Sequence, residues 1–406
     1  MKVVVANKFY FKNGGSEVVM FQERDFLVSM GVEVIDFSMT DERNFPSAQA
    51  SYFVSNKSYS AVGKMQKLAA SVSLVHSTEA VKRFGSLLDD TQPDLVHCHN
   101  IYHQLTPSII GVAAKRKIPV VLTLHDYKPI CPVYTRLRNG EPCSACASGN
   151  FEGVLKHRCA DGSFAKSFLL WLEARFHTLK GSYHHVAQFI APSCFMFDSA
   201  RCRFPESQVT YIANGIDATR IIPAEEDDGY VIYFGRLSPE KGVKTLLRAH
   251  EASGRAWRLV VVGKGPLFQE LIAEFPGAQF LGHIEGADLE RTVAGAAIVV
   301  VPSEWYENSP LSVLEAMAHG KPIIGSRIGG IPEHIVDGET GVLFEPGDIE
   351  GLSKHIHALM ADEETRRRLG KAARKRVEAN FSLKSHNDKL FSLYSELCSS
   401  SLPGTN

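Results

Sequence analysis

Two glutamates lie eight positions apart in the stretch SEWYENSPLSVLEAMAHGKP, residues 303–322. Glu307 follows the apolar run AAIVVVPS, and Glu315 lies inside the helical pattern that comes next, beside apolar residues. A carboxylate among apolar residues is costly unless donors surround it, and ligand hydroxyl groups are such donors. The pair therefore predicts a site for a polyhydroxylated ligand. The alternative is an exposed Glu315, with Glu307 as a charge that complements the helix dipole.

The helix that carries Glu315 also offers an anion site. Ser309 is predicted as its N-cap, Pro310 as its first residue and Gly320 as its end, because these residue types prefer those positions. The free backbone N–H groups near Leu311 and the positive end of the helix dipole favour a phosphate. We therefore expect a phosphate between the two glutamates.

Two cations follow another predicted strand. In FGRLSPEKG, Gly235 and Arg236 come directly after the strand, and Lys241 precedes a helix. Two cations at the carboxyl end of a strand suit a diphosphate, because guanidinium and ammonium groups both bind phosphate oxygens. Two surface cations are the alternative interpretation.

A pair of glycines ends the next strand of this half. Gly263 and Gly265 stand in VVVGKGPLFQE, but Phe268 occupies the position of the third glycine in a dinucleotide fingerprint. The pair therefore predicts a tight turn whose backbone a ligand can approach, and it disfavours an NAD site.

Residues that could bind a ligand or take part in catalysis also follow the strands of the first half. They are Gly14, Gly15, His99, His103, His125 and Asn214. A single histidine is usually structural, but His125 comes directly after the strand VVLTL, with Asp126 next to it. Because ligands of parallel sheets bind outside the carboxyl ends of the strands, we expect His125 to face the ligand.

The elements that must position these residues alternate regularly. Short apolar strands and amphipathic helices follow one another in both halves, which predicts an α/β protein with two doubly wound, Rossmann-like domains. The segment PAEEDDG, 223–229, is the expected linker, so the domains are 1–224 and 225–380, followed by a C-terminal helix and a frayed tail in 381–406. The carboxyl ends of the two sheets are expected to face each other across a cleft.

Composition excludes several classes of protein. The net charge of −1 over 406 residues gives no field that would attract nucleic acid. The sequence has no run of 18 apolar residues, and the N-terminal MKVVVANKFYF is too short for a signal-peptide core. We therefore expect a cytoplasmic protein whose eight cysteines are reduced thiols.

Four of the cysteines interrupt the α/β rhythm, in an insertion at about 128–162. Cys131, Cys143, Cys146 and Cys159 have the spacing C-x11-C-x2-C-x12-C. Four thiols with one C-x2-C pair fit a structural, tetrahedral zinc site that would staple a loop with little core of its own. Loop cysteines without metal and an iron–sulfur cluster are the alternatives.

An amphipathic, basic segment follows the cysteines. Residues 154–185 contain five Lys or Arg against two Asp or Glu, and apolar residues recur at helical spacing. These are Phe168, Trp171, Leu172, Phe176 and Leu179. The favoured interpretation is a helix whose apolar face packs on the domain core. The alternative is a helix on a membrane surface, at the inner face of the cell membrane, which would suit a lipid-linked acceptor.

Together these motifs resemble one known family. Glu307 and Glu315 match the E-x7-E pair of the family-four retaining nucleotide-sugar glycosyltransferases, which have the two-domain GT-B fold. GRLSPEKG, GKGP, LEAMAHGKPIIGSRIGGIPEHIVDGETGVLFEPGD, NGID and the early NGGSE match in the same order, over nearly the whole chain. The resemblance is to the glycogen synthase and mannosyltransferase group, of the polysaccharide-biosynthesis type. Many members have Gly-Phe-Gly after the first glutamate, where this chain has Asn308-Ser309-Pro310.

The resemblance implies a role for each matched residue. Arg236 and Lys241 would neutralise the departing diphosphate, Glu315 would hold the ribose hydroxyls and Glu307 would bind the donor sugar. His125 would contact that sugar or its phosphate. The other donor-binding positions would be Gly14, Gly15, Asn214, Gly235, Gly263, Gly265, Ser309, Pro310 and Leu311. The family's reaction keeps the anomeric configuration and needs no catalytic metal, and two cations with a helix dipole can stabilise a leaving phosphate.

The leading hypothesis is therefore transfer of a sugar from a UDP- or GDP-sugar to a glycan, lipid-linked in cell-surface polysaccharide assembly. A sugar-nucleotide epimerase or a phosphorylase on the same fold is a second hypothesis, although no clear cofactor lysine is present. An NAD-dependent oxidoreductase is disfavoured by Phe268. A metal-stapled binding module that lost its activity is a non-enzymatic alternative, and the intact set of Glu307, Glu315, Arg236 and Lys241 speaks against it.

Overall fold

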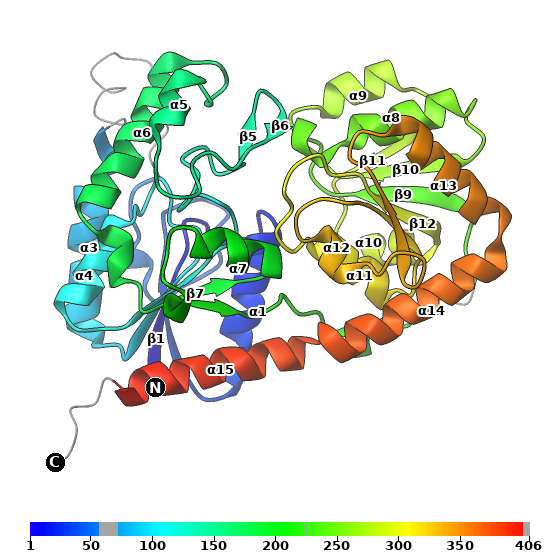
Figure 1. Ribbon diagram of the computed structural model, residues 1–406. Coiled ribbons are helices and arrows are strands. Elements are labelled where there is room, and N and C mark those ends of the chain that lie inside the picture. Colours follow the sequence, from blue (N-terminus) through cyan, green and yellow to red (C-terminus); the bar gives the residue numbers. More distant parts are fainter. Residues whose placement is uncertain (57–71, 225, 401–406) are drawn as a thin grey trace. The chain divides into compact units, whose positions relative to one another are not determined.

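The computed structural model describes residues 1–56, 72–224 and 226–400. The chain divides into two compact units (Figure 1). Unit 1 comprises Met1–Asn139, Cys143–Ile212 and Asn387–Asn406, and unit 2 comprises Gly140–Pro142 and Ala213–His386. Residues 213–224 therefore cluster with the second unit, and the chain returns to the first from residue 387. The expected frayed tail, 401–406, and Glu225 of the expected linker lie outside the described residues.

Unit 1 is built on a six-stranded parallel sheet in the order β2-β1-β3-β4-β7-β8. The strands are β1 (Lys2–Ala6), β2 (Glu33–Phe37), β3 (Leu95–Cys98), β4 (Val120–Thr123), β7 (Gln188–Ala191) and β8 (Val209–Tyr211). The helices are α1 (Gly15–Ser29), α3 (Thr78–Thr91), α4 (Ser108–Lys115), α5 (Glu152–Lys156), α6 (Phe164–Leu179) and α7 (Cys194–Arg201), with short 3-10 turns η1 (Ala50–Tyr52), η2 (Ser182–His185) and η3 (Glu206–Gln208). A hairpin of β5 (Leu137–Arg138) and β6 (Glu141–Pro142) begins in this unit.

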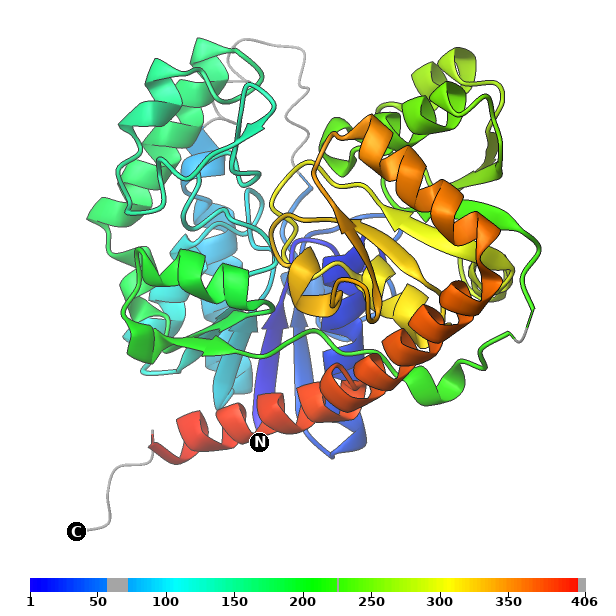
Figure 2. The same cartoon turned by 45° about the vertical axis from the view of Figure 1, so that its right-hand side comes forward.

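Unit 2 repeats the plan with the order β11-β10-β9-β12-β13-β14, again parallel. Its strands are β9 (Tyr230–Phe234), β10 (Arg258–Val262), β11 (Gln279–Gly282), β12 (Ala296–Val301), β13 (Ile323–Ser326) and β14 (Gly341–Phe344). Its helices are α8 (Val243–Ala252), α9 (Phe268–Glu274), α10 (Ala287–Ala294), α11 (Leu311–Ala318), α12 (Ile331–His334), α13 (Ile349–Ala361) and α14 (Glu363–Asn380), with turns η4 (Ala218–Arg220) and η5 (Pro239–Lys241). Figure 2 shows α13 and α14 along this sheet from a second direction.

Burial of both sheet faces explains the core of unit 2. In unit 2, side chains such as Val231 and Val261 on one sheet face pack with Leu246 of α8 and Ile356 of α13. The strands are buried on both faces, as expected for a parallel sheet between two helical layers. The prediction of two doubly wound α/β domains is confirmed.

The last helix, α15 (Leu383–Ser400), belongs to both units. At its start, the N–H of Leu383 donates to the carbonyl oxygen of Ile216 at 3.0 Å, within unit 2. Further along, Leu390 and Tyr394 are fully buried in the core of unit 1, together with Val3 and Leu27. This helix therefore completes a core laid down by residues nearly 400 positions earlier in the sequence.

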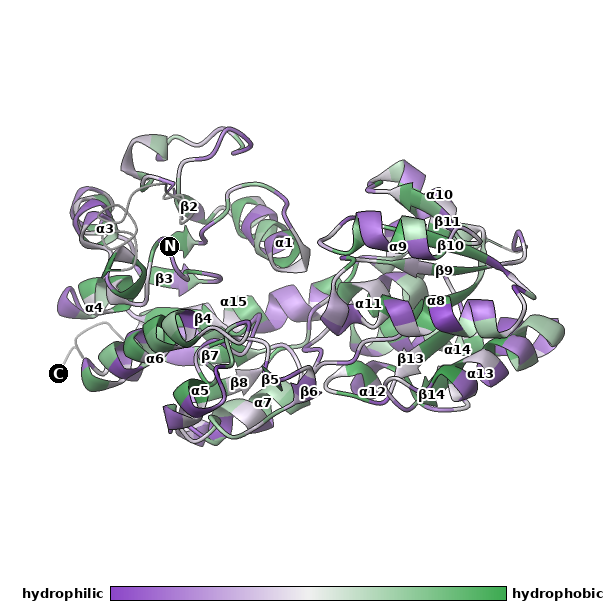
Figure 3. Ribbon diagram, turned by 90° about the horizontal axis from the view of Figure 1, so that it is seen from above, coloured by the Kyte–Doolittle hydropathy of each residue, from purple (hydrophilic) through white to green (hydrophobic). Residues whose placement is uncertain are grey.

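Helix α6 buries polar residues and exposes apolar ones, contrary to the favoured prediction. Its polar Ser167, Glu173 and His177 are buried, whereas Phe168 is 44% exposed and Leu172 is 41% exposed. The buried face is polar because it meets polar partners: Glu173 pairs with Lys128, and His177 hydrogen-bonds Ser182 and the carbonyl of Val75. Figure 3 shows α6 mostly in green, the colour of hydrophobic residues. The interpretation in which its apolar face packs on the core is wrong.

Candidate functional site

In each sheet the strand order reverses beside the first strand of its unit, between β1 and β3 and between β9 and β12. Such a switch point leaves a crevice outside the carboxyl ends of the strands, because the connections on either side turn away in opposite directions. The loops after β9 and β12 carry Gly235, Arg236, Lys241 and Glu307. The residues singled out in the second half of the sequence therefore lie at the position where doubly wound sheets bind ligands.

Glu307 and Lys241 form a partly buried ion pair in unit 2. Lys241 Nζ lies 2.7 Å from Glu307 Oε1, and the hydroxyl of Ser303 donates to the same oxygen at 2.6 Å. Burial alone would raise the pKa of the Glu307 carboxyl, but Lys241 and these hydrogen bonds outweigh it, and the pKa is lowered. Lys241 also lies 5.1 Å from the centre of the Trp305 ring. The glutamate is therefore an ionised acceptor held at a fixed place.

Glu315 has the opposite electrostatic character. It lies on α11, between the fully buried Leu314 and Ala316. Burial, and then the negative charge of Glu290, raise the pKa of its carboxyl to about 7. Desolvation disfavours the ionised carboxylate, and donors that a ligand brings would favour it. The contact of Glu315 with ligand hydroxyl groups stays a prediction.

The start of α11 differs by one residue from the sequence prediction. Pro310 is the N-cap, with φ −71° and ψ 119°, and the helix begins at Leu311. Ser309 is therefore not the N-cap, because the extended conformation at Pro310 delays the first helical turn. The carbonyl of Ser309 accepts a hydrogen bond from Asn214 Nδ2 at 3.1 Å, and its hydroxyl lies 3.2 Å from His334 Nε2. Asn214 thus anchors the loop that leads into the helix.

The glycine pair after β10 is needed by the protein's own backbone. A Cβ on Gly263 would lie 1.9 Å from the carbonyl oxygen of Gly235, and one on Gly265 would lie 2.2 Å from that of Leu237. Gly263 also has φ +131°, a conformation that other residues rarely adopt. The loops after β9 and β10 therefore pack backbone to backbone, which brings the loop of Arg236 and Lys241 to its place. Arg236 itself is exposed, and its carbonyl accepts a hydrogen bond from the Tyr233 hydroxyl at 2.8 Å.

In unit 1, Gly14 and Gly15 lie in the exposed loop after β1. Gly14 is the N-cap of α1, in an extended conformation, and Gly15 is the first helical residue. The neighbouring Ser16 hydroxyl accepts a hydrogen bond from Asn100 Nδ2 at 2.9 Å, which joins this loop to the loop after β3. The two glycines therefore lie at the switch point of the first sheet.

His125 follows β4 and contacts a second histidine. Its Nε2 lies 2.8 Å from Nδ1 of His99, which directly follows β3. Oε2 of Glu23, on α1, lies 3.6 Å from His99 Nε2 and 3.4 Å from His97 Nδ1. Tyr394 completes the group with its hydroxyl 2.5 Å from His97 Nδ1. Glu23, His97 and Tyr394 were not predicted from the sequence; the pattern His97-x-His99 at the end of β3 was the available signal.

His103 joins a different group. Its Nδ1 lies 3.5 Å from Oε1 of Glu173, and Lys128 Nζ donates to Oε2 of the same glutamate at 2.6 Å. Burial would raise the pKa of the Glu173 carboxyl, but Lys128 and His103 outweigh it and lower the pKa to about 2. Lys128 lies three residues after His125, so this ion pair ties α6 to the loop of His125.

The four predicted metal ligands, Cys131, Cys143, Cys146 and Cys159, line one small cavity, together with Arg136 and apolar residues. The group whose ligand atoms already lie within 4.8 Å of one another, among the residues that the structure describes, is instead Glu23, His97 and His99.

Two doubly wound units with acidic and basic groups at the strand ends define a broad class of α/β protein, and comparison with known families narrows that class. The model described as Glycosyltransferase Family 4 matches residues 13–220, more than half of the chain, and that described as Glycosyl transferases group 1 matches residues 217–376. The chain belongs to the family-4 glycosyltransferases, and its fold is GT-B.

Individual relatives agree with this assignment. A sulfoquinovosyl transferase of Arabidopsis thaliana is 38% identical over 295 residues, which cover 71% of this chain and 54% of the relative. A glycogen synthase of Mycobacterium tuberculosis is 33% identical over 193 residues, or 43% of this chain and 45% of the relative. The chain thus spans about half the length of the curated relatives it matches.

Solved structures show the same fold at lower identity. Sucrose-phosphate synthase of Thermosynechococcus elongatus has a TM-score of 0.73 at 20% identity, covering 98% of this chain and 100% of that one. An Anabaena protein, HepE, in complex with UDP-glucose has a TM-score of 0.66 at 18% identity, with coverage of 98% and 100%.

Proposed function

We propose that this protein is a retaining glycosyltransferase that moves a sugar from a nucleoside diphosphate to a glycan. The single observation that carries the proposal is the Lys241–Glu307 ion pair beside the switch point of the second sheet, with Glu315 eight residues further on. Family membership supports it, as does the UDP-glucose bound by a protein of the same fold.

In this mechanism the cations act on the leaving group. The bond between the anomeric carbon and the phosphate oxygen breaks, and the diphosphate gains negative charge. Arg236, Lys241 and the N–H groups at the start of α11 stabilise that charge, because fixed donors need no reorganisation during the reaction. The acceptor oxygen forms the new bond on the same face of the sugar, and its proton passes to the departing phosphate oxygen. No catalytic metal takes part in this proposal.

The two glutamates divide the donor between them. Glu307, ionised and fixed by Lys241, accepts hydrogen bonds from sugar hydroxyls. Glu315, whose pKa is raised to about 7 by burial, accepts from the ribose hydroxyls, which then supply the donors that its surroundings lack. Each glutamate therefore recognises a different hydroxylated ring, with the diphosphate between them.

The acceptor is proposed to be a lipid-linked glycan at the cytoplasmic face of a membrane, in polysaccharide assembly. The observation behind this is α6, which exposes Phe164, Phe168 and Leu172 while Lys166 stands on the same helix with a 64% exposed side chain. An exposed apolar helix face with basic residues suits the surface of an anionic bilayer. No helix in the described part of the chain is long and apolar enough to cross a bilayer.

Melting temperature against a ligand panel tests the donor. The panel contains UDP, GDP, dTDP, their common sugars and NAD, because a ligand that binds only the native state raises its stability by RT ln(1 + [L]/Kd). One nucleoside diphosphate is expected to raise the melting temperature, and Glu315→Ala is expected to abolish the rise. A rise with NAD alone, or none with any nucleotide, would overturn the proposal. The anomeric configuration of the product, followed by NMR, then tests retention.

Flotation with lipid vesicles tests the membrane acceptor separately. The wild type is expected to float with vesicles of anionic phospholipid and to stay behind with neutral ones. Phe168→Glu combined with Leu172→Glu is expected to abolish flotation. Ile222→Glu changes an apolar residue of unit 2 that is 87% exposed and serves as the control. Absence of wild-type flotation would refute the membrane acceptor and leave the transferase proposal standing.

A further inference from the structure

The segment between β4 and α6 has little regular secondary structure, although several of its side chains, such as Tyr127, Ile130 and Phe151, are buried. Its regular structure consists of two-residue strands β5 and β6 and the five-residue helix α5. Five residues of the segment have positive φ without being glycine: Tyr134, Arg136, Asn139, Arg158 and Asp161. A short hairpin and a five-residue helix are not stable by themselves, and positive φ is costly for such residues. A crosslink between its loops would add to these buried side chains in holding the segment in one conformation.

The four cysteines of the segment converge at its centre. Cys131, Cys143, Cys146 and Cys159 line a cavity that leaves about 20 Å³ for the centre of a water-sized sphere, which is room for one small ion or one water. None of the four is in a disulfide, and Cys131 is only 8% exposed. Arg136 also lines the cavity. Four thiolates around a divalent metal ion leave a net negative charge, which the guanidinium group of Arg136 would partly balance. Four soft ligands around an ion-sized space are the features of a closed tetrahedral metal site.

We propose that these four cysteines bind one structural zinc ion that staples the segment between the loop of His125 and helix α6. Zn–S bonds of about 2.3 Å place the sulfur atoms about 3.8 Å apart, so zinc draws the four thiols closer together than they stand without metal. Zinc is bound by thiolates, so its binding displaces protons from the thiols. All four positions on the metal are filled, so its function is structural.

Metal content of the full-length chain, purified under reducing conditions, tests the zinc site. One zinc per chain is expected in the wild type, none in Cys143→Ser combined with Cys146→Ser, and one in the control Cys194→Ser combined with Cys202→Ser, which changes two exposed thiols. Replacement by Co²⁺ is expected to give the intense thiolate-to-metal absorption of a tetrahedral sulfur site. Iron with visible colour, no metal, or metal retained after the Cys143/Cys146 change would each overturn the proposal.

A second measurement covers the case in which the cysteine variants fail to fold. Stepwise modification of the wild-type thiols with a mercurial is expected to release one zinc per chain, together with a fall in melting temperature. Addition of Zn²⁺ to the demetallated chain in weak buffer is expected to release protons and to restore that temperature. Release of zinc without any change in melting temperature would refute a stapling role.

An independent arrangement lies beneath His125. The carboxylate of Glu23, 2% exposed, lies 3.6 Å from His99 Nε2 and 3.4 Å from His97 Nδ1, and neither contact is a hydrogen bond. Its negative charge nevertheless favours an N–H on each nitrogen that faces it. Nδ1 of neutral His99 is then an acceptor, so the Nε2–H of His125 donates to it at 2.8 Å. This order of protons leaves Nδ1 as the basic nitrogen of His125. In this arrangement the carboxylate of Glu23 sets the tautomer of His125, and it does so through His99, which lies between them.

We infer that Glu23 and His99 are positioning residues that fix the orientation and tautomer of His125 at the carboxyl end of the first sheet. The inference rests on the proposed function, because it is the family resemblance that implies a contact of His125 with the donor sugar or its phosphate. Tyr394 and Thr123 hold the other partner, His97, from its two nitrogens, at 2.5 and 2.8 Å, so α15 supports the same group. A carboxylate that orients a histidine in this way acts through that histidine and does not touch substrate.

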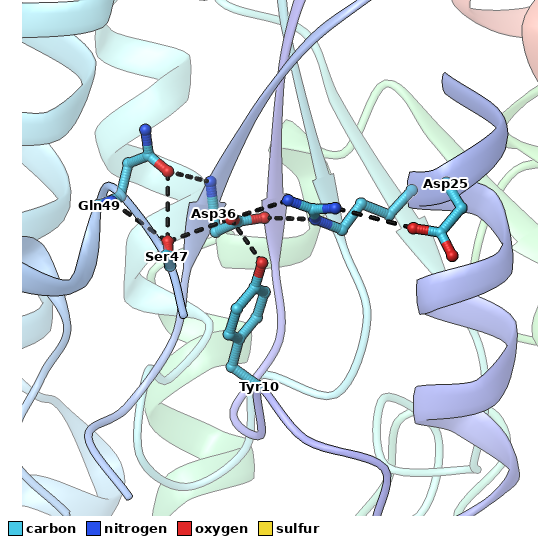
Figure 4. A network of polar contacts seen from close by, with 6 residues as sticks. Tyr10, Asp25, Asp36, Ser47 and Gln49 are labelled. Atoms are coloured by element: carbon cyan, nitrogen blue, oxygen red, sulfur yellow. Dashed lines mark hydrogen bonds and ion pairs between the residues drawn. The ribbon is translucent and has the colours of Figure 1, made fainter. Parts of the chain in front are cut away.

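The control for this inference is a second buried carboxylate of unit 1. Figure 4 shows Asp36 of β2 bound by Tyr10 and Ser47, and it also accepts from Arg24 at 2.9 Å. Its contacts do not include the histidines. Asp36→Asn therefore removes a buried charge from unit 1 without changing the group beneath His125.

Turnover and histidine NMR test the inference together. Glu23→Gln is expected to lower kcat about 10- to 100-fold with little change in the KM for the donor. In ¹⁵N spectra, His125 is expected to change from the Nε2–H tautomer to a mixture. Asp36→Asn is expected to leave kcat and the tautomer unchanged. Wild-type kcat in Glu23→Gln, or a metal whose content depends on Glu23, would overturn it. A nucleotide-induced rise in melting temperature that persists in Glu23→Gln separates this failure from a failure of the proposed function.

Discussion

The two sheets have different kinds of functional side chain at the carboxyl ends of their strands. In unit 2 the ionic groups, Lys241 and Glu307, come from loops that follow neighbouring strands, and each stands inside a short sequence motif. In unit 1 the corresponding end has histidines, and the groups that hold them come from α1 and from α15, almost 300 residues away. Charges that bind a ligand can thus be recognised locally, whereas a histidine that must be oriented depends on partners from distant elements.

The largest expected effect breaks the buried ion pair of unit 1. Glu173→Ala leaves Lys128 buried without its carboxylate, and the free energy of unfolding is expected to fall by about 3–5 kcal/mol. Denaturant titration measures it. Arg367→Ala breaks the exposed ion pair with Glu363 and is expected to cost no more than about 1 kcal/mol. Equal losses would mean that burial does not set the difference.

The same pair has a predicted pH dependence. Because the pKa of the Glu173 carboxyl is lowered to about 2 from an ordinary 4.5, the unfolded chain binds more protons between these values. The pair's stabilisation is therefore fully present above pH 4.5 and is lost as the pH falls through about 2. Glu173→Gln is expected to flatten this acid slope in thermal unfolding curves.

The next prediction concerns the ion pair of unit 2, whose variants are expected to change turnover and stability independently. Lys241→Ala is expected to lower turnover about 100- to 1000-fold, because a fixed cation at the leaving phosphate is lost. Lys354→Ala, an exposed lysine of α13, is the matched control. Combining Lys241→Ala with Glu307→Gln is expected to recover stability, since no unpaired charge remains, but not turnover. Recovered turnover in the double variant would contradict the assigned role of Lys241.

A smaller effect concerns Glu315, and here the stability changes with pH in the direction opposite to that for Glu173. Its folded pKa of about 7 exceeds the ordinary 4.5, so the folded chain binds more protons and stability falls as the pH rises through this window. Glu315→Gln is expected to raise the melting temperature at pH 8 by about 2–4 °C and to change little near pH 4.5. It is also expected to weaken nucleotide binding. A variant that gains stability and keeps its affinity would remove Glu315 from the donor site.

The smallest effect sharpens the comparison through two asparagines. Asn214→Ala removes the hydrogen bond to the Ser309 carbonyl and is expected to cost about 1 kcal/mol and less than tenfold in turnover. Asn44→Ala removes a similar bond to the Met39 carbonyl, in unit 1. It is expected to cost about the same stability with no change in turnover. Equal effects on turnover would place Asn214 outside the site.

Much of the fold was predictable because its signals are local. Apolar runs such as AAIVVV alternate with amphipathic helices, and a strand buried on both faces has no other way to satisfy that pattern. The positions of Glu307 and Lys241 after their strands followed from the same periodicity. The start of α11 was missed by one residue, since Pro310 adopts an extended conformation that sequence preference does not specify.

Tertiary structure alone decided which face of α6 is buried and which groups surround His125. The spacing of apolar residues in α6 does not tell which face of the helix packs on the domain. Burial of the polar face depends on its contacts with Lys128, Ser182 and the carbonyl of Val75. Likewise, Glu23 and Tyr394 reach the histidines only because α1 and α15 cover one sheet together. The sequence by itself determined the periodic elements and the charged motifs at strand ends, because those depend on neighbours along the chain. Which distant partners neutralise or orient a buried group depends on packing.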